Sequence, residues 1–172
     1  MKKSEKAFLV VSILVIISLF IFSNFQEPVE PKDFVKNKTF TNYSTSFFNF
    51  EITRYPSNVE IRSTEQVNGT AFIGFVTDPW NINFGVIPGN GTFVTRNIEL
   101  TNKKGTNSKI ILKAYGNITP LVFFSKNNFV LKPREKVAID IFLFSNKTKA
   151  GNYTGEIDVI AQKPIYNFLP IS

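Results

Sequence analysis

The feature that most constrains this chain is a series of short stretches in which apolar and polar residues alternate, each bounded by turn residues. In the first of them, Ile82, Phe84 and Val86 alternate with polar or small residues, which is the period-two pattern of a strand with one buried face. Pro88-Gly89-Asn90-Gly91 then turns the chain. Seven such stretches between residues 80 and 160 predict an all-β sandwich.

The same alternation predicts which side chains face inward. In the longest stretch one face carries Val137, Ile139, Ile141 and Leu143. Phe142 and Phe144 have the opposite parity, so we expect them to project outward if that sheet has one wet face. In the last stretch, we expect Ile157 and Val159 to face inward and the carboxylates that alternate with them, Glu156 and Asp158, to face outward.

Four segments, in this order, carry a resemblance: Ile82-Asn-Phe-Gly85, Ile98-Glu-Leu-Thr-Asn102, Asn128-Phe-Val-Leu-Lys-Pro133 and Gly151-Asn-Tyr-Thr-Gly-Glu-Ile157. Over about half of its length the chain resembles the immunoglobulin-like domains of the abnormal-spindle, major-sperm-protein and hydin type, as found in single-pass archaeal surface proteins. The resemblance implies an immunoglobulin-like β-sandwich that acts as a non-enzymatic interaction module. It transfers no catalytic residue. Tyr153 is expected to tie a loop to a strand through its hydroxyl group.

The amino terminus predicts a single membrane anchor. Residues 1–6 form a positively charged leader, and residues 7–25 form a predicted transmembrane helix whose apolar part is interrupted only by Ser12 and Ser18. An apolar helix of this length reaches roughly 25 Å, which just spans a bilayer. The lysines of the leader favour an inside amino terminus and an outside carboxy-terminal domain. A cleaved signal peptide and a prepilin-type processing site after Ala7 are the alternatives.

The rest of the chain divides into a stalk, a domain and a tail. Residues 26–46 are rich in Pro, Glu, Lys, Asn and Thr and are predicted to be a stalk or linker without a fixed fold. Residues 47–161 are predicted to be the sandwich. Alternating stretches at 48–52 and 59–61 and an apolar stretch at 71–76 predict that residues 47–77 add two or three strands to the set, because about thirty residues cannot bury a core alone. Residues 162–172 form an apolar carboxy-terminal tail.

Seven Asn-x-Ser/Thr sequons predict an externally displayed glycoprotein, because such sites are modified only outside the cytoplasm. Most of them lie in predicted loops, where a glycan is solvated. An Asn-rich composition with no site occupied is the alternative. The candidate asparagines are Asn37, Asn42, Asn68, Asn90, Asn117, Asn146 and Asn152.

The composition argues against an enzyme. The chain has no Cys and no His, which removes disulfides, thiolate chemistry, the commonest general base and the commonest metal ligand. Glu156 and Asp158 share one strand face, and Asp140 is a candidate neighbour, an arrangement that an acid/base pair or a calcium site could use. Outward carboxylates on a solvated face are the ordinary case, and we predict no catalytic, cofactor-binding or metal site.

Two features point to partners. The first is a candidate contact surface formed by Phe142, Phe144, Ile165, Tyr166, Phe168 and Leu169, since clustered exposed apolar groups often mark an interface. A tail that folds back over the two phenylalanines, or that extends a sheet edge, is the alternative. The second is the net charge of +7. Two lysine-rich hairpins, around Lys103 and around Arg134, suit an acidic surface polymer or anionic headgroups, or are simply solvated.

These observations favour a single-pass protein of the cell membrane with its domain outside. The first hypothesis is a non-enzymatic binding or scaffolding module of the cell envelope, without a cofactor, whose partners are other envelope proteins or surface polymer. Nucleic acid is excluded on this side of a membrane. The alternative is a structural subunit of an envelope assembly, such as a pilus, archaellum or secretion complex, that associates with copies of itself.

Overall fold

The structure is a computed structural model that describes residues 3–24, 30–63, 80–166 and 171. One helix, α1 (Lys3–Asn24), precedes the strands. Within the described residues, no helix meets the length and hydropathy needed to cross a membrane. The remaining elements, in chain order, are β1 (Thr39–Ser44), β2 (Phe48–Arg62), β3 (Ile82–Pro88), β4 (Asn90–Thr101), β5 (Ser108–Gly116), the 3-10 turn η2 (Thr119–Leu121), β6 (Val122–Phe124), β7 (Phe129–Leu131), β8 (Lys136–Asn146) and β9 (Gly151–Pro164).

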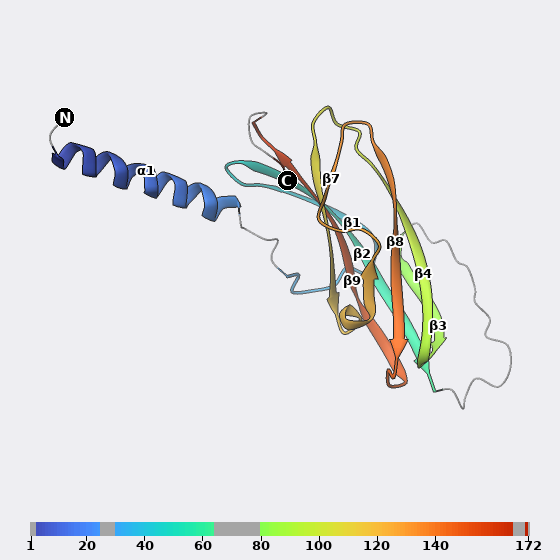
Figure 1. Cartoon of the computed structure of the whole chain (residues 1–172). Coiled ribbons are helices and arrows are strands. Elements are labelled where there is room, and N and C mark those ends of the chain that lie inside the picture. Colours follow the sequence, from blue (N-terminus) through green and yellow to red (C-terminus); the bar gives the residue numbers. More distant parts are fainter. Residues whose placement is uncertain (1–2, 25–29, 64–79, 167–170, 172) are drawn as a thin grey trace.

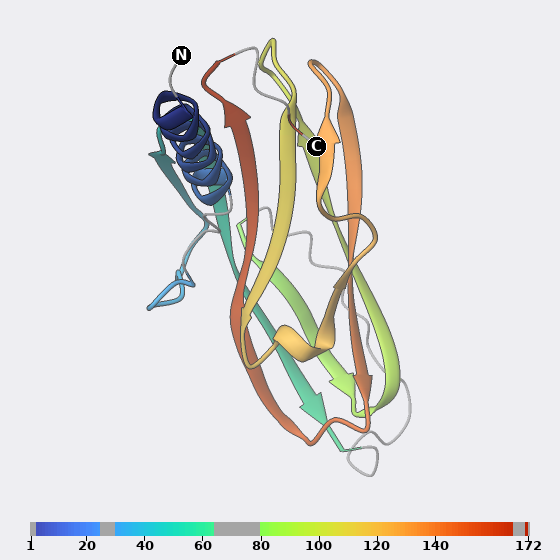
Figure 2. The ribbon, with the colours of Figure 1, turned by 60° about the vertical axis from the view of Figure 1, so that its left-hand side comes forward.

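The strands form two sheets packed face to face. Sheet A has the order β1-β2-β9-β5-β7, with β3 added in parallel to β2, and sheet B has the order β4-β8-β6. All other strand pairs are antiparallel. Figure 1 shows β2, β9 and β7 on one side and β4 and β8 on the other, and Figure 2 shows β9 between β2 and β5. The predicted all-β fold is confirmed, and the two layers fit a β-sandwich.

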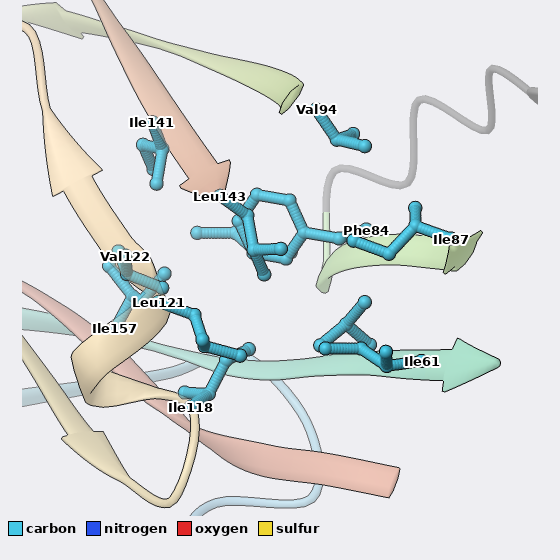
Figure 3. Packing of buried hydrophobic residues seen from close by; sticks show 12 residues of the cluster. Ile61, Phe84, Ile87, Val94, Ile118, Leu121, Val122, Ile141, Leu143 and Ile157 are labelled. Atoms are coloured by element: carbon cyan, nitrogen blue, oxygen red, sulfur yellow. The ribbon is translucent and has the colours of Figure 1, made fainter. Parts of the chain in front are cut away.

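The main hydrophobic core lies between the sheets. Figure 3 shows its side chains converging from strands of both sheets and from the turn η2. Ile157 of sheet A and Ile141 and Leu143 of sheet B are all fully buried in it. Burying one side chain of this size stabilises the fold by about 1.5–3 kcal/mol. The inward parity predicted for β8 and for Ile157 and Val159 is therefore confirmed.

The parity predicted for β3 is wrong at its end. Ile82 and Phe84 are buried as expected, but Val86 is exposed and Ile87 is buried in its place. Gly85, which lies between Phe84 and Val86, has a φ of +79°, and the register of β3 against β2 shifts at this point. An extra residue in one strand, accommodated by a glycine with positive φ, is a β-bulge and reverses the alternation that follows.

The sheet begins earlier than the predicted domain. Residues 39–44, expected in the stalk, form β1 along the edge of β2. The two stretches expected around 48–52 and 59–61 are one strand, β2, which passes through Pro56. Along one side of β2 the pairing with β1 stops at Arg54 and the pairing with β3 starts at Ser57, so the proline, which has no N–H, lies in a gap of the ladder. The apolar stretch 71–76, also expected as a strand, lies outside the described residues.

Gly155 supplies a test of how closely β5 and β9 approach. A Cβ at Gly155 would overlap the carbonyl oxygen of Tyr115 and lie 2.7 Å from Cγ2 of Ile118. Gly155→Ala should therefore lower the free energy of unfolding by on the order of 3 kcal/mol, measured by urea denaturation. Gly105→Ala is the matched control, because a Cβ at Gly105 meets nothing within 4 Å. Equal stability of the two variants would contradict this account of the packing.

Candidate contact surface

The outer face of sheet B carries four phenylalanines from three strands, which we call the phenylalanine patch: Phe93, Phe123, Phe142 and Phe144. On β8, Phe144 pairs with Phe93 of β4, and Phe142 pairs with Phe123 of β6. The rings of Phe93 and Phe144 stack with their centroids 4.4 Å apart. The pleat of the central strand therefore collects aromatic side chains from both of its neighbours on one face.

The patch is exposed to a degree that is unusual for phenylalanine. Phe93 and Phe123 are 61% and 52% exposed, whereas Phe142 and Phe144 are half-buried by their neighbours. The outward orientation predicted for Phe142 and Phe144 agrees with the structure. Phe93 and Phe123 were not among the residues predicted to form a contact surface, although the alternation of their strands places them outward. Each is the residue next to one that faces the core, Val94 and Val122 respectively.

The described part of the carboxy-terminal tail, residues 162–166 and 171, lies apart from this patch. The backbone N–H of Ile165 donates to the carbonyl of Phe47, 2.8 Å away, which continues the pairing of β9 with β2 beyond Pro164. Ile171 packs against a buried cluster on the outer face of sheet A formed by Phe48, Phe50, Ile52 and Ile160. The described part of the tail thus belongs to sheet A and does not join Phe142 and Phe144. Ile165 and Tyr166 are exposed, and Phe168 and Leu169 lie outside the described residues.

The candidate glycosylation sites that the structure describes are all exposed. They are Asn37, Asn42, Asn90, Asn117, Asn146 and Asn152; Asn68 lies outside the described residues. Asn90 and Asn146 are direct partners in the pairing of β4 with β8. The side-chain oxygen of Asn117 accepts a hydrogen bond from the N–H of Thr154, 2.6 Å away, which leaves its amide nitrogen outside that bond. Their accessibility is compatible with glycans.

Glu156 and Asp158 lie on the face of β9 opposite to Ile157 and Val159, as predicted, but the predicted exposure of that face to solvent is wrong, because both side chains are buried. Glu156 is 0% exposed and Asp158 is 4% exposed. Two causes act together. Strand β9 lies in the interior of sheet A, between β2 and β5, and residues 33–35 cover the outer face of the sheet at this point, where the N–H of Val35 donates to Oε2 of Glu156 at 2.8 Å. A segment expected to be a free stalk therefore closes over the carboxylates.

Arg54 completes what we call the ionic cluster, which consists of Arg54, Glu156 and Asp158. Its Nε lies 2.6 Å from Oε1 of Glu156 and its Nη2 lies 3.0 Å from Oε2, a bidentate pair of the kind that fixes both side chains. The same Nη2 donates to the carbonyl oxygen of Asp33 at 3.0 Å. The guanidinium group thus joins the sheet to the covering segment. On β2, Arg54 follows Phe48, Phe50 and Ile52 at the same spacing of two residues. This alternation places Arg54 on a buried face, where a charged side chain needs a partner, and the sequence analysis did not use it.

Asp158 lies in the same cluster without such a partner. Burial, together with a hydrogen bond to Glu156 and the negative charge of that group, raises the pKa of Asp158 to about 8, despite the opposing effect of Arg54. Its Oδ1 has no hydrogen-bond partner among the described residues. Two close carboxyl groups in a desolvated site cannot both ionise at low free energy. Asp158 is therefore mainly protonated at neutral pH.

The contacts of the cluster join β2 and β9 to the covering residues 33–35. Glu156 is inaccessible to solvent, and both of its carboxylate oxygens accept hydrogen bonds, Oε1 from Arg54 and Oε2 from Arg54 and Val35. Asp140, the third candidate carboxylate, lies on β8 in sheet B and accepts from Nδ2 of Asn97 at 2.9 Å, so the structure does not bring it to the pair. Among the residues described, no group of three or more acidic side chains is placed to hold a metal ion.

The chain matches no family model, and no curated protein sequence matches it.

The ionic cluster predicts a distinct pH dependence. Because the pKa of Asp158 rises from 3.8 when unfolded to about 8 when folded, the folded state holds a proton that the unfolded state has lost between these values. The free energy of unfolding should therefore fall as the pH rises from about 4 to about 8, with a slope approaching about 1.4 kcal/mol per pH unit from this group. Asp158→Asn should remove this contribution, as measured by denaturation across that pH range.

Asp140→Asn is the control for this experiment, since it removes a carboxylate outside the cluster. A slope that is the same in the wild type and in Asp158→Asn would show that Asp158 does not retain its proton on folding.

Proposed function

We propose that this chain is a membrane-anchored, externally displayed, non-enzymatic binding or scaffolding module of the cell envelope, and that it contacts another envelope protein through the phenylalanine patch. The observation that carries the proposal is the exposure of Phe93 and Phe123 beside two further phenylalanines on one sheet face. A contiguous aromatic surface is unfavourable in water and is enriched at protein interfaces. Polar groups adjoin it, among them the hydrogen-bonded pair Asn97 and Asp140, as at an interface rim.

We further infer that the sandwich is an immunoglobulin-like domain of the abnormal-spindle, major-sperm-protein and hydin type. The four segments that carry the resemblance fall on or beside β3, β4, β7 and β9. Tyr153 donates its hydroxyl hydrogen bond to the backbone carbonyl of Lys149, 3.0 Å away. This bond between a strand and the turn before it was expected from the resemblance and supports it, since it has the form of a tyrosine corner.

The anchor is proposed from the character of α1. From Ala7 to Leu19 the helix is apolar except at Ser12 and Ser18, and its large apolar side chains are exposed, including Phe8 at 75%, Ile16 at 65% and Leu19 at 64%. In the sequence the apolar run continues through Phe20, Ile21 and Phe22. Figure 1 shows the helix extending away from the two sheets. A helix without a polar face is stable when surrounded by apolar groups, which a bilayer supplies. The lysines before it favour an inside amino terminus.

A peptide map by mass spectrometry of the full chain from native membranes tests the anchor and its orientation. We expect an intact leader and glycans on exposed sequons such as Asn90 and Asn146. Deleting residues 7–25 should move the chain from the alkali-washed membrane pellet to the supernatant. A chain that stays in the pellet without residues 7–25 would contradict the proposed anchor, and a complete map with every sequon unmodified would contradict external glycosylation.

Cross-linking in native membranes tests the patch. We expect the full chain to form a cross-linked product with a different envelope protein, and Phe93→Ser/Phe123→Ser to reduce its yield at least about tenfold, because buried aromatic anchors commonly supply 2 kcal/mol or more. Both side chains are exposed, so the fold should be retained. The matched control is Ile165→Ser/Tyr166→Ser, which removes two exposed apolar side chains from the other sheet.

Each outcome of this experiment has a distinct meaning. A product containing two copies of this chain, lost in the Phe93→Ser/Phe123→Ser variant, would favour the structural-subunit alternative. A yield unaffected by that variant would overturn the proposed contact surface.

A further inference from the structure

A cleft of about 270 Å³ opens between the sheets at one end of the sandwich. We call it the end cleft. It lies where β4 runs into the loop before β5, and it is independent of both the phenylalanine patch and the ionic cluster. Its inner wall is the end of the hydrophobic core: Ile110, Leu131 and Val159 belong to a buried cluster, with Leu100 and Ala161 packed against it. The floor of the cleft is therefore apolar.

The walls change from apolar to polar toward the mouth. Along β9 the lining residues are Val159, then Ala161, then Lys163, and along β5 they are Ile110 and then Ser108 at the strand end. Lys163 is paired with Glu51 of β2. Lys103 and Lys104, in the loop after β4, are exposed and also line the cleft. The mouth thus carries more positive than negative charge.

The mouth is held in place by Asn102, which joins two loops. Its side-chain Nδ2 donates to the carbonyls of Thr106 and Leu131, at 2.8 and 3.0 Å. Its backbone N–H donates to Glu135 and its backbone carbonyl accepts from Arg134. Asn102 is 5% exposed. A site whose loops are fixed by buried hydrogen bonds is pre-organised, which lowers the entropic cost of binding.

Ser108 gives an independent sign of a ligand. It lines the cleft and is 2% exposed, and its Oγ has no hydrogen-bond partner among the described residues. A buried hydroxyl without a partner is unfavourable, because it loses its hydrogen bonds to water and gains none in the protein. A polar atom of a ligand seated in the mouth would satisfy it.

We propose that the end cleft binds an anionic amphiphile, with its alkyl chain on the apolar floor and its anionic head among Lys103, Lys104 and Ser108. The polarity gradient sets this orientation. The volume favours a single short chain over a peptide, because it lies just below the roughly 300–1,000 Å³ of ordinary ligand pockets. The lysines at the mouth select a negative head over a neutral or cationic one.

The test uses octanoate as the probe, with the full chain reconstituted in vesicles of zwitterionic phosphatidylcholine. A photo-reactive octanoate analogue carrying a diazirine should label peptides that contain the floor residues, mapped by mass spectrometry. Octanoate should displace the label, whereas octanol and octylammonium, which match the chain without the negative charge, should not. The label should be found on β4, β5, β7 or β9, apart from any lipid-facing label on α1.

Charge-reversal variants separate a specific site from general attraction. Lys103→Glu/Lys104→Glu should reduce labelling at least about tenfold, equivalent to about 1.4 kcal/mol. Lys126→Glu/Lys132→Glu makes the same charge change on either side of β7, at exposed residues that do not line the cleft and make no backbone bond to Asn102, and should retain labelling. Ser108→Ala should weaken labelling several-fold while leaving the fold intact.

Three results would overturn the proposal. They are equal loss of label in both charge-reversal variants, displacement of the label by octanol, and labelling confined to peptides that do not line the cleft. If an acidic peptide displaces the label and octanoate does not, the ligand of the cleft is a peptide and the amphiphile proposal is wrong.

Discussion

Strand β9 is the element on which the rest of the structure depends, because its middle, residues 155–160, is buried on both of its faces. It pairs along its whole length with β2 on one side and for much of it with β5 on the other. Ile157 faces the core between the sheets and Ile160 faces the opposite way, and both are fully buried. Any ionisable side chain on such a strand must find its partners within the protein, since water does not reach it. Glu156 meets this condition through Arg54 and Val35.

This constraint explains how the chain before the sandwich is held. The group that neutralises Glu156 also contacts the carbonyl of Asp33, so residues 33–35 are fastened to sheet A. The described part of the tail contributes Ile171 to the same outer face. Sheet A is therefore covered by its own chain, whereas the outer face of sheet B keeps its aromatic side chains exposed. The contact that we propose is therefore placed on the outer face of sheet B.

The sequence predicted those features that depend on one strand and its alternation. The inward residues of β8, the outward orientation of Phe142 and the hydroxyl contact of Tyr153 all follow from local pattern or from the resemblance. The predictions from the sequence fail where a second element determines whether a side chain is buried. Burial of Glu156 depends on strand order and on a covering segment, and exposure of Val86 depends on a bulge at Gly85. Neither can be deduced from parity, because parity assigns a side chain to a face without saying what lies over that face.

The end cleft illustrates the same distinction in another form. Its lysines are visible in the sequence as a charged loop, and the ordinary interpretation is that they are solvated. The feature that suits these lysines to an amphiphilic ligand is the apolar floor beneath them. This floor comes from β5, β7 and β9, and the packing of the two sheets places it next to the lysines. The phenylalanine patch, in contrast, is built from three adjacent strands of one sheet. Because the two surfaces share no residue, a partner on the patch and a ligand in the cleft can bind without competing for the same side chains.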